Sequence, residues 1–203
     1  MKIVALMGEK GGTGRSMLAV QLAVAATAAG VKTCVLDTNP RGNIWEWAAQ
    51  RHATGLGMPE VSLAQSPLAS ALDAAQRMHY GLVLIDCSAA ARAADIIGSR
   101  AVLVLLPFRP ALPDMQKMLE GASALRARAQ VLAVCNGANA GTSEAKEALE
   151  FLAEAGQVKC ARTVIHDRVL FRRTFAAGKG VAEMGSKSKA KDEIIALYQE
   201  LVL

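Results

Sequence analysis

Short apolar runs alternate along the chain with longer segments of helical periodicity. Several of the short runs are apolar at every position, which is typical of parallel strands covered on both faces. The Ala-rich segments between them repeat their apolar residues at helical spacing. The predicted strands are 2–7, 32–37, 61–64, 82–86, 101–106, 130–135 and 161–165. The predicted helices are 16–29, 43–51, 67–78, 89–98, 113–128, 143–155 and 192–202.

This alternation predicts an α/β fold in which a mostly parallel twisted sheet has helices on both faces and right-handed crossovers. With no internal repeat and no linker-like change of composition, we expect a single domain over residues 1–203. Ligands of such folds bind at the carboxyl ends of the strands. The segments that follow those ends are 8–16, 37–43, 86–90, 107–114 and 136–142.

Composition excludes several classes of protein. The chain is 52% hydrophobic and 20% charged with a mean hydropathy of +0.25, which excludes a disordered chain. Its apolar runs are far shorter than the roughly 20 residues that span a bilayer, and the N-terminus lacks a signal-peptide pattern. The four cysteines have no metal-ligand spacing, so we expect reduced thiols in a cytoplasmic protein. No histidine has a carboxylate or cysteine at catalytic spacing, and we expect surface or capping roles for all three.

A glycine-rich loop follows the first predicted strand. Three glycines within residues 11–14 leave the backbone free to wrap its N–H groups around an anion at a helix N-terminus. The hydroxyl of Ser16, at the start of that helix, suits Mg²⁺. The common pattern G-x-x-x-x-G-K-[ST] is not met, because Glu9 replaces a glycine and Arg15 replaces the lysine.

The chain resembles the ParA/MinD family of deviant Walker A ATPases in five segments that occur in the family's order. The loop is similar to K-G-G-x-G-K-[ST], and Lys10 matches the early lysine of that motif. The other segments resemble, in turn, the D-x-D-P-Q-G segment, the Walker B strand, the P-x-x-P-S-x-x-D turn and the late R-x-A-…-G-K/R block. They are residues 37–43, 80–86, 107–114 and 168–179. The short, plasmid-partition type ParA proteins resemble the chain most.

The resemblance implies that two subunits sandwich two ATP molecules, with Lys10 reaching the nucleotide of the other subunit. It implies a catalytic centre at Lys10, Asp37 and Asn39, and Mg²⁺ held directly by Ser16, through water by Asp86, and near Asp37. The implied residues for ATP or ADP are Lys10, Gly11, Gly12, Thr13, Gly14, Arg15, Ser16, Met17 and Asn136. Asn136 follows the sixth predicted strand, either near the adenine base or as a plain turn residue.

Two departures from the family pattern concern the chemistry. Arg15 keeps the positive charge of the lysine, but its planar fork is larger and cannot occupy the same point. Asn39 replaces the second aspartate of D-x-D, and an amide cannot take a proton from the attacking water. We therefore expect altered nucleotide binding and hydrolysis that is slow or partner-dependent. Whether the protein is an ATPase stays open; the alternatives are a regulator without turnover and a dimer that Arg15 traps with ATP.

Basic residues gather in residues 159–191, which we call the late basic segment. Nine lysines and arginines stand there against two acidic residues, so this segment carries the excess charge of a chain whose net charge is +5. A cluster of basic residues of this kind suits contact with the phosphate backbone of DNA. Family members bind DNA non-specifically here, which implies that role for Arg162, Arg168, Arg172 and Arg173. A solvated helix face is the alternative.

The resemblance thus implies a cytoplasmic, nucleoid-associated homodimer that positions or segregates a plasmid, a chromosome region or a large protein assembly. A ParB-like or cargo-adaptor protein would release it from DNA. A MinD-like membrane switch is an alternative, because residues 192–203 form an amphipathic helix. The polar face of that helix is acidic, so we expect it to dock on the core and expect no membrane contact. An amide-forming or carboxylating enzyme is a third possibility, but no residues for a second substrate are evident.

Overall fold

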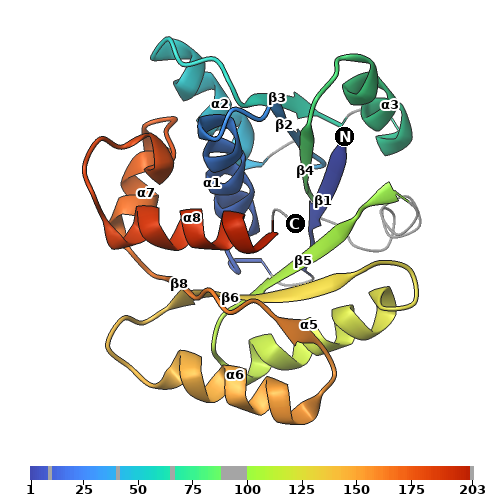
Figure 1. The fold of residues 1–203 in the computed structure, drawn as a ribbon, viewed down its shortest axis with the longest axis vertical. Helices are drawn as coiled ribbons and strands as arrows, with labels where there is room; N and C mark the ends of the chain where they lie inside the picture. Colours follow the sequence, from blue (N-terminus) through green and yellow to red (C-terminus); the bar gives the residue numbers. More distant parts are fainter. Residues whose placement is uncertain (9–10, 40–41, 65–66, 88–99, 202–203) are drawn as a thin grey trace.

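One parallel sheet forms the centre of the molecule. The computed structural model describes residues 1–8, 11–39, 42–64, 67–87 and 100–201. The strands are β1 (Lys2–Leu6), β2 (Thr33–Asp37), β3 (Glu60–Leu63), β4 (Leu82–Asp86), β5 (Leu103–Phe108), β6 (Val131–Ala138), β7 (Lys159–Cys160) and β8 (Ile165–His166). Their order is β3-β2-β4-β1-β5-β6-β7, and β8 also pairs with β6 (Figure 1). Every described pair is parallel, which confirms the α/β fold that the sequence predicts.

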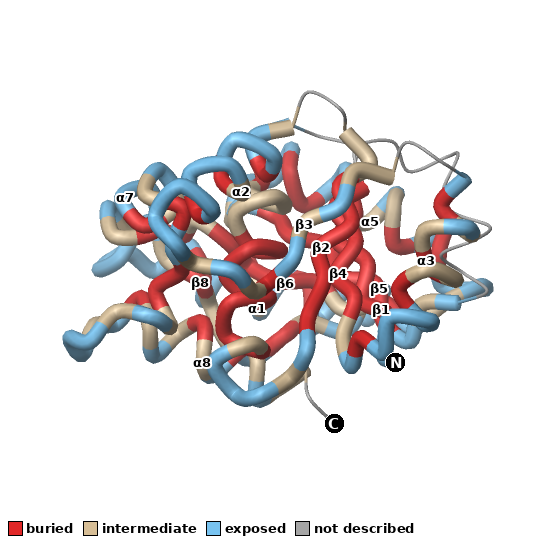
Figure 2. Tube along the Cα trace, turned by 90° about the horizontal axis from the view of Figure 1, so that it is seen from above, coloured by how far each residue is buried: buried red, intermediate tan, exposed pale blue. Residues whose placement is uncertain are grey.

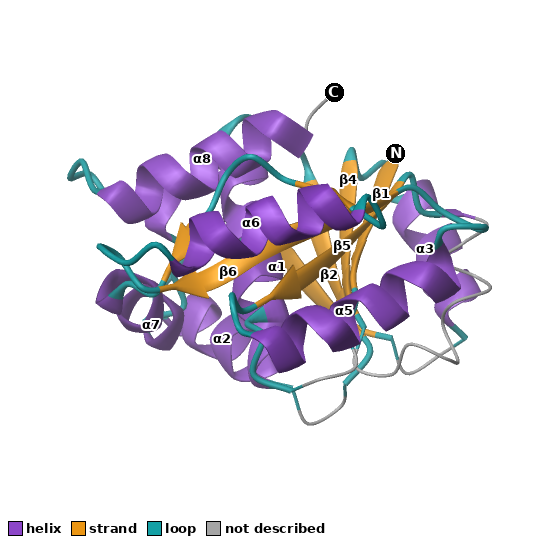
Figure 3. Cartoon of the chain, turned by 90° about the horizontal axis from the view of Figure 1, so that it is seen from below, coloured by secondary structure: helices purple, strands orange, loops and turns teal. Residues whose placement is uncertain are grey.

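Helices cover both faces of this sheet. They are α1 (Arg15–Ala28), α2 (Asn43–Ala53), α3 (Leu68–Arg77), α5 (Leu112–Leu125), α6 (Glu144–Ala155), α7 (Val169–Ala176) and α8 (Lys189–Leu201), with the 3-10 helix η1 (Val181–Glu183). Side chains of α3, α5 and α6 pack into one buried cluster, and those of α1, α2, α7 and α8 pack into the other. Figure 3 shows α5 and α6 in front of the strands, with α1 and α2 behind them.

Helix α1 lies in the middle of the second layer and is apolar around most of its surface. Its residues from Leu18 to Ala26 are all buried, and Figure 2 shows the buried chain concentrated in the strands and in this helix. Gln21 is the polar exception. Its amide oxygen accepts a hydrogen bond from the N–H of Val181 at 2.7 Å, and its amide nitrogen donates to Thr174 Oγ1 at 3.3 Å. These bonds satisfy a buried polar side chain and hold α7 and η1 against α1.

Helix α8 docks on the same layer. Ala190, Ile194 and Leu197 are buried against α1 and η1, which confirms that its apolar face belongs to the core. No helix in the described part of the chain combines the length and apolar character needed to cross a bilayer.

Some predicted elements differ from the structure. The predicted strand 161–165 is wrong: two strands of two residues each, β7 and β8, pair with successive parts of β6 instead. Pairs this short are too brief to show a hydrophobic period. Helix α7 was not predicted, because only Phe171 and Thr174 of its residues are buried. Strand β6 extends to Ala138, and the predicted helix 89–98 lies outside the described residues.

Candidate functional site

The glycine-rich loop joins β1 to α1 at the carboxyl edge of the sheet. Gly12 and Gly14 have φ angles of +86° and +82°, which favour glycine. A Cβ atom on Gly14 would lie 2.3 Å from Asn136 Nδ2. That nitrogen donates a hydrogen bond of 2.6 Å to the carbonyl of Thr13, so β6 holds the loop in place. Gly14 caps α1 without a side-chain hydrogen bond, which leaves the first N–H groups of the helix for an anion.

Ser16 and Asp86 meet beneath this loop. Ser16 Oγ donates a hydrogen bond of 2.5 Å to Asp86 Oδ2 across the start of α1 and the end of β4. Asp86 is buried, and its other carboxylate oxygen, Oδ1, has no hydrogen-bond partner among the described residues. Burial raises the pKa of Asp86 above its ordinary value, although the Ser16 hydroxyl and the charge of Arg15 oppose that rise.

Asp37 ends the neighbouring strand, β2, directly opposite Asp86 in the sheet register. Its side chain accepts a hydrogen bond of 2.8 Å from the N–H of Asn39 at Oδ1, whereas Oδ2 has no hydrogen-bond partner in the part of the chain that the structure describes. Burial, together with the nearby negative charge of Asp86, raises the pKa of Asp37 to about 6, despite the opposing hydrogen bond from Asn39. The sequence-predicted pair of acidic residues is therefore together and buried.

These oxygen atoms fit Mg²⁺, which prefers hydroxyl and carboxylate oxygens. Ser16 Oγ is such an atom, and Asp37 and Asp86 each contribute a buried oxygen that nothing in the described chain satisfies. Within the described ranges, no group of three histidine, cysteine or acidic side chains could hold a metal unaided. Water and phosphate oxygens would have to complete the coordination, which is the usual arrangement for Mg²⁺ with a nucleotide.

Arg15 points back into the base of the loop. Its Nη1 donates to the carbonyl oxygen of Gly8 at 2.8 Å and also to that of Cys87, after β4. The side chain lies along Gly8, since a Cβ there would be 3.5 Å from Arg15 Cδ. Arg15 thus ties the loop to the end of β4, a contact that the sequence analysis did not foresee.

A cavity of about 640 Å³ opens beside the loop. Its wall runs from Gly12–Met17 through the start of α2 to Arg109 and Asn136, and then to β8 and α7. This volume is in the range of ordinary ligand pockets. Phe171 and Phe175 of α7 are the aromatic residues of this wall.

The remaining predicted site residues are distributed around this cavity. Thr13 is buried, and its Oγ1 has no hydrogen-bond partner among the residues that the structure describes; Met17 is half-buried at the cavity wall. Asn136 lies within β6, so its interpretation as a turn residue is wrong; its Oδ1 is buried and likewise has no partner within the described ranges. Gly11 is exposed, and Lys10 lies outside the described residues.

The late basic segment forms another wall of the cavity, where α8 neutralises part of its charge. Arg168 Nε donates to both carboxylate oxygens of Glu193, at 3.0 and 3.1 Å. This hydrogen bonding raises the pKa of Arg168 still further. His166 Nδ1 lies 2.8 Å from the same carboxylate. The expectation that every histidine is a surface or capping group is therefore wrong for His166, whose partner is 27 residues away in the sequence.

The other predicted DNA-contacting residues are more exposed. The Arg162 side chain is 92% exposed and lies 3.8 Å from Glu200, which also accepts the backbone N–H of Arg162. Arg172 is exposed and paired with Asp167, and Arg173 is exposed on α7. Two of the four arginines, Arg168 and Arg172, also line the cavity.

Sequence reasoning missed Arg109 and Glu193 as parts of this site. Arg109 belongs to the 107–114 segment, and its Nε donates to the carbonyl of Gly12 at 3.2 Å. Its place after the fifth strand was the available signal, since carboxyl ends of parallel strands meet at one edge. Glu193 had no such signal, because it is one acidic residue on an amphipathic helix.

Known proteins share this architecture. The carboxysome distribution maintenance protein A of Gloeobacter kilaueensis is 32% identical over 122 residues, which is 59% of this chain and 54% of that protein. The chain thus matches about half the length of that relative. MinD of Pyrococcus horikoshii, solved with Mg-ADP, superposes with a TM-score of 0.76 at 17% identity, over 99% of this chain and 96% of MinD. The ATP complex of a substituted McdA from Cyanothece gives 0.73 at 15% identity, over 99% of this chain and 96% of that McdA.

A family model bears directly on the site. The model described as the CobQ/CobB/MinD/ParA nucleotide binding domain matches residues 4–181. That range contains the glycine-rich loop, both buried aspartates and most of the cavity wall. The protein therefore belongs to the CobQ/CobB/MinD/ParA family of nucleotide-binding domains.

Proposed function

We propose that this protein is an ATP-dependent switch of the ParA/MinD type, which dimerises with ATP, binds non-specific DNA and positions cargo through an adaptor protein. One observation carries the nucleotide site. Every buried side-chain oxygen or nitrogen without a hydrogen-bond partner in the described chain lies at the loop or beside it. These atoms are Thr13 Oγ1, Asp37 Oδ2, Asp86 Oδ1 and Asn136 Oδ1. Buried polar atoms are nearly always satisfied, so four exceptions at one place favour a polar ligand.

Different residues of the site would bind the phosphates, the Mg²⁺ ion and the adenine base. The N–H groups of the loop and of the first turn of α1 would bind the phosphates, and Ser16 with Asp86 would hold Mg²⁺. The ion supplies charge neutralisation at the phosphates. Asn136 Oδ1 suits a hydrogen bond from the amino group of adenine, while its Nδ2 keeps the loop in place.

Hydrolysis is expected to be slow. Asp37 is the nearest carboxylate that could orient an attacking water, but it already accepts the N–H of Asn39. Asn39 lacks the charge and basicity of an aspartate. Arg15 lines the cavity, but its Nη1 is already engaged by two carbonyl groups of the protein. A partner protein that supplies a missing charge would then control turnover.

DNA binding is proposed through exposed arginines of the late basic segment. Arg162 and Arg173 are the most accessible of them, and contacts to phosphates would give steep salt dependence. DNA is favoured over a membrane because the apolar face of α8 is buried against α1. The Gloeobacter relative, which maintains carboxysome distribution by name, suggests a large protein assembly as cargo.

A binding experiment tests the proposal. The protein is titrated with ATP at fixed Mg²⁺, and its mass in solution is measured with and without ATP. We expect binding and a dimer with ATP, and at least tenfold weaker Mg-ATP binding for Ser16→Ala. Ser143→Ala is the matched control, because Ser143 also stands at a helix N-terminus, as the residue before α6, and its side chain makes no capping hydrogen bond there. Absence of ATP binding by the wild-type protein contradicts the proposal.

DNA binding and turnover are measured next. With ATP present, DNA affinity should fall about tenfold or more between 50 and 200 mM salt, and insensitivity to salt argues against phosphate contacts. For turnover, Arg15→Lys/Asn39→Asp should hydrolyse ATP faster than the wild-type protein. Equal rates would contradict the explanation from Arg15 and Asn39.

A further inference from the structure

Arg109 brings a positive charge to the glycine-rich loop from a different part of the chain. It follows β5 and donates Nε to the carbonyl of Gly12 at 3.2 Å, across 97 residues of sequence. Its guanidinium lies over Gly137, whose φ angle is +74° and whose Cβ would be 3.5 Å from Arg109 Cζ. The side chain therefore spans the loop and β6, where it forms part of the cavity wall.

Arg15, the arginine inside the loop, is engaged elsewhere. Its Nη1 donates to the carbonyl groups of Gly8 and Cys87. The Nη1 donors of Arg15 are thus used at the base of the loop, although the residue also forms part of the cavity wall. A lysine at this position usually directs its charge at the phosphates.

The other arginines of the cavity wall are paired with acids. Arg168 is bound by Glu193, and Arg172 is paired with Asp167. Arg109 is exposed, and within the described ranges it makes no ion pair. Arginine has five N–H donors in a planar fork, and only one of them is used on Gly12. The rest are available to an anion in the cavity.

We propose that Arg109 binds the phosphate chain of the nucleotide and provides hydrogen bonds that Arg15 Nη1, engaged on Gly8 and Cys87, does not make. This inference rests on the nucleotide site proposed above and deepens it. The guanidinium fork suits two phosphate oxygens at once. Gly12, to which Arg109 is already bound, is part of the loop that would wrap the same phosphates.

Affinities for ATP, ADP, AMP and adenosine test the inference, because Arg109 should contact the phosphates and not the nucleoside. In Arg109→Gln, ATP binding should weaken about 10- to 100-fold, the usual effect of losing a charge-assisted hydrogen bond. Adenosine affinity should be unchanged, and AMP should be affected less than ATP. Arg109→Lys should recover part of the loss, because it keeps the charge without the fork.

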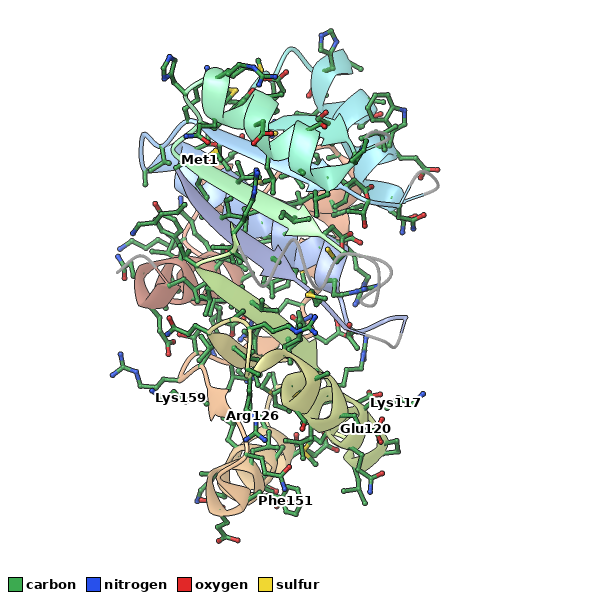
Figure 4. All side chains as sticks on the ribbon, turned by 90° about the vertical axis from the view of Figure 1, so that its right-hand side faces the viewer. Met1, Lys117, Glu120, Arg126, Phe151 and Lys159 are labelled. Carbon is green, nitrogen blue, oxygen red and sulfur yellow. The ribbon has the colours of Figure 1, made fainter. Side chains whose placement is uncertain are left out.

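Arg126→Gln is the matched control. Arg126 is also exposed and also donates to a backbone carbonyl, that of Gln157 at 3.1 Å. It precedes β6 and therefore lies toward the opposite edge of the sheet from Arg109, near helix α6 (Figure 4). Its substitution should leave all four affinities unchanged.

Several outcomes separate this inference from the proposed function. If the wild-type protein binds ATP and Arg109→Gln binds it equally well, the role of Arg109 is wrong while the nucleotide site stands. If Arg109→Gln weakens adenosine as much as ATP, Arg109 supports the shape of the cavity and not the phosphates. If Arg15→Gln loses ATP affinity while Arg109→Gln does not, Arg15 is the phosphate ligand. If the wild-type protein binds no ATP, both proposals fail together.

Discussion

The glycine-rich loop and the late basic segment both place charged or polar groups at the same cavity. The two regions differ in whether those groups have hydrogen-bond partners within the protein. At the loop, buried oxygens of Asp37 and Asp86 have no partner in the described chain. In the late basic segment, Arg168 is held by two bonds to Glu193, and Glu200 accepts the N–H groups of Arg162 and Thr163. The loop region thus has buried polar atoms without a partner in the described chain, whereas these polar groups of the late basic segment are paired within the protein.

This difference separates a ligand site from a scaffold. An unpartnered buried carboxylate costs free energy that a bound ligand can recover, so the loop is expected to respond strongly to nucleotide. Internal pairs hold their geometry without a ligand, and they reduce the charge offered to DNA. Part of the basic excess seen in the sequence is therefore neutralised inside the protein, and exposed residues such as Arg162 are its accessible remainder.

The largest effect on stability is expected from the substitution Gly178→Ala, in the late basic segment. A Cβ there would lie 2.3 Å from the backbone nitrogen of Arg51, and Gly178 has a φ angle of +66°. The buried Arg51 also donates to the Gly178 carbonyl at 3.0 Å, so the contact cannot open freely. We expect the free energy of unfolding in urea to fall by about 3 kcal/mol or more.

Gly156→Ala is the control for this substitution. Gly156 has a similar φ angle, +61°, but nothing lies within 4 Å of its Cβ position. The free energy of unfolding of Gly156→Ala should fall by only about 1 kcal/mol, because of backbone strain. Equal losses in the two variants would mean that close packing against α2 does not anchor the segment.

The substitution Asp37→Asn, beside the loop, is expected to have a smaller effect on stability and to stabilise the protein. The pKa of Asp37 is about 6 in the folded protein against an ordinary value of 3.8, because the charged form is buried. The folded state then binds the proton more tightly, so this group makes stability fall as the pH rises from about 4 to about 6. In EDTA at pH 8, Asp37→Asn should raise the free energy of unfolding by about 1–3 kcal/mol.

The variant should also flatten the dependence of stability on pH between about 4 and 6. Asp73→Asn serves for comparison, since Asp73 is half-exposed and paired with Arg100 at the surface. It should change stability by less than about 1 kcal/mol. A destabilised Asp37→Asn protein at pH 8 would show that Asp37 is a satisfied structural residue and would remove the contrast between the two regions.

Sequence patterns predicted where the residues around the loop lie, because each of them is marked by its own local pattern. Glycines 11, 12 and 14, Ser16 and the strand-ending Asp37 and Asp86 each stand beside a strong apolar run. The rest depends on contacts between distant segments: Asn136 with Thr13, and Arg109 with Gly12. The hydrophobic periodicity of a single segment gives no information about contacts between segments that are distant in the sequence. The short β7 and β8 and the polar surface of α7 were missed for a related reason, since few of their residues are buried.

The smallest effect, and the most informative for DNA binding, is expected from Glu193→Gln. The pair with Arg168 is partly buried, with side chains 21% and 13% exposed, so losing its charge should cost about 1 kcal/mol of stability. Glu150→Gln, in the exposed pair with Lys146, should cost less than about 0.5 kcal/mol. If Arg168 takes part in DNA binding, its release should also raise DNA affinity a few-fold with ATP at low salt, while Glu150→Gln leaves affinity unchanged. An unchanged DNA affinity in Glu193→Gln would assign Arg168 to the cavity wall alone and leave Arg162, Arg172 and Arg173 as the residues for DNA.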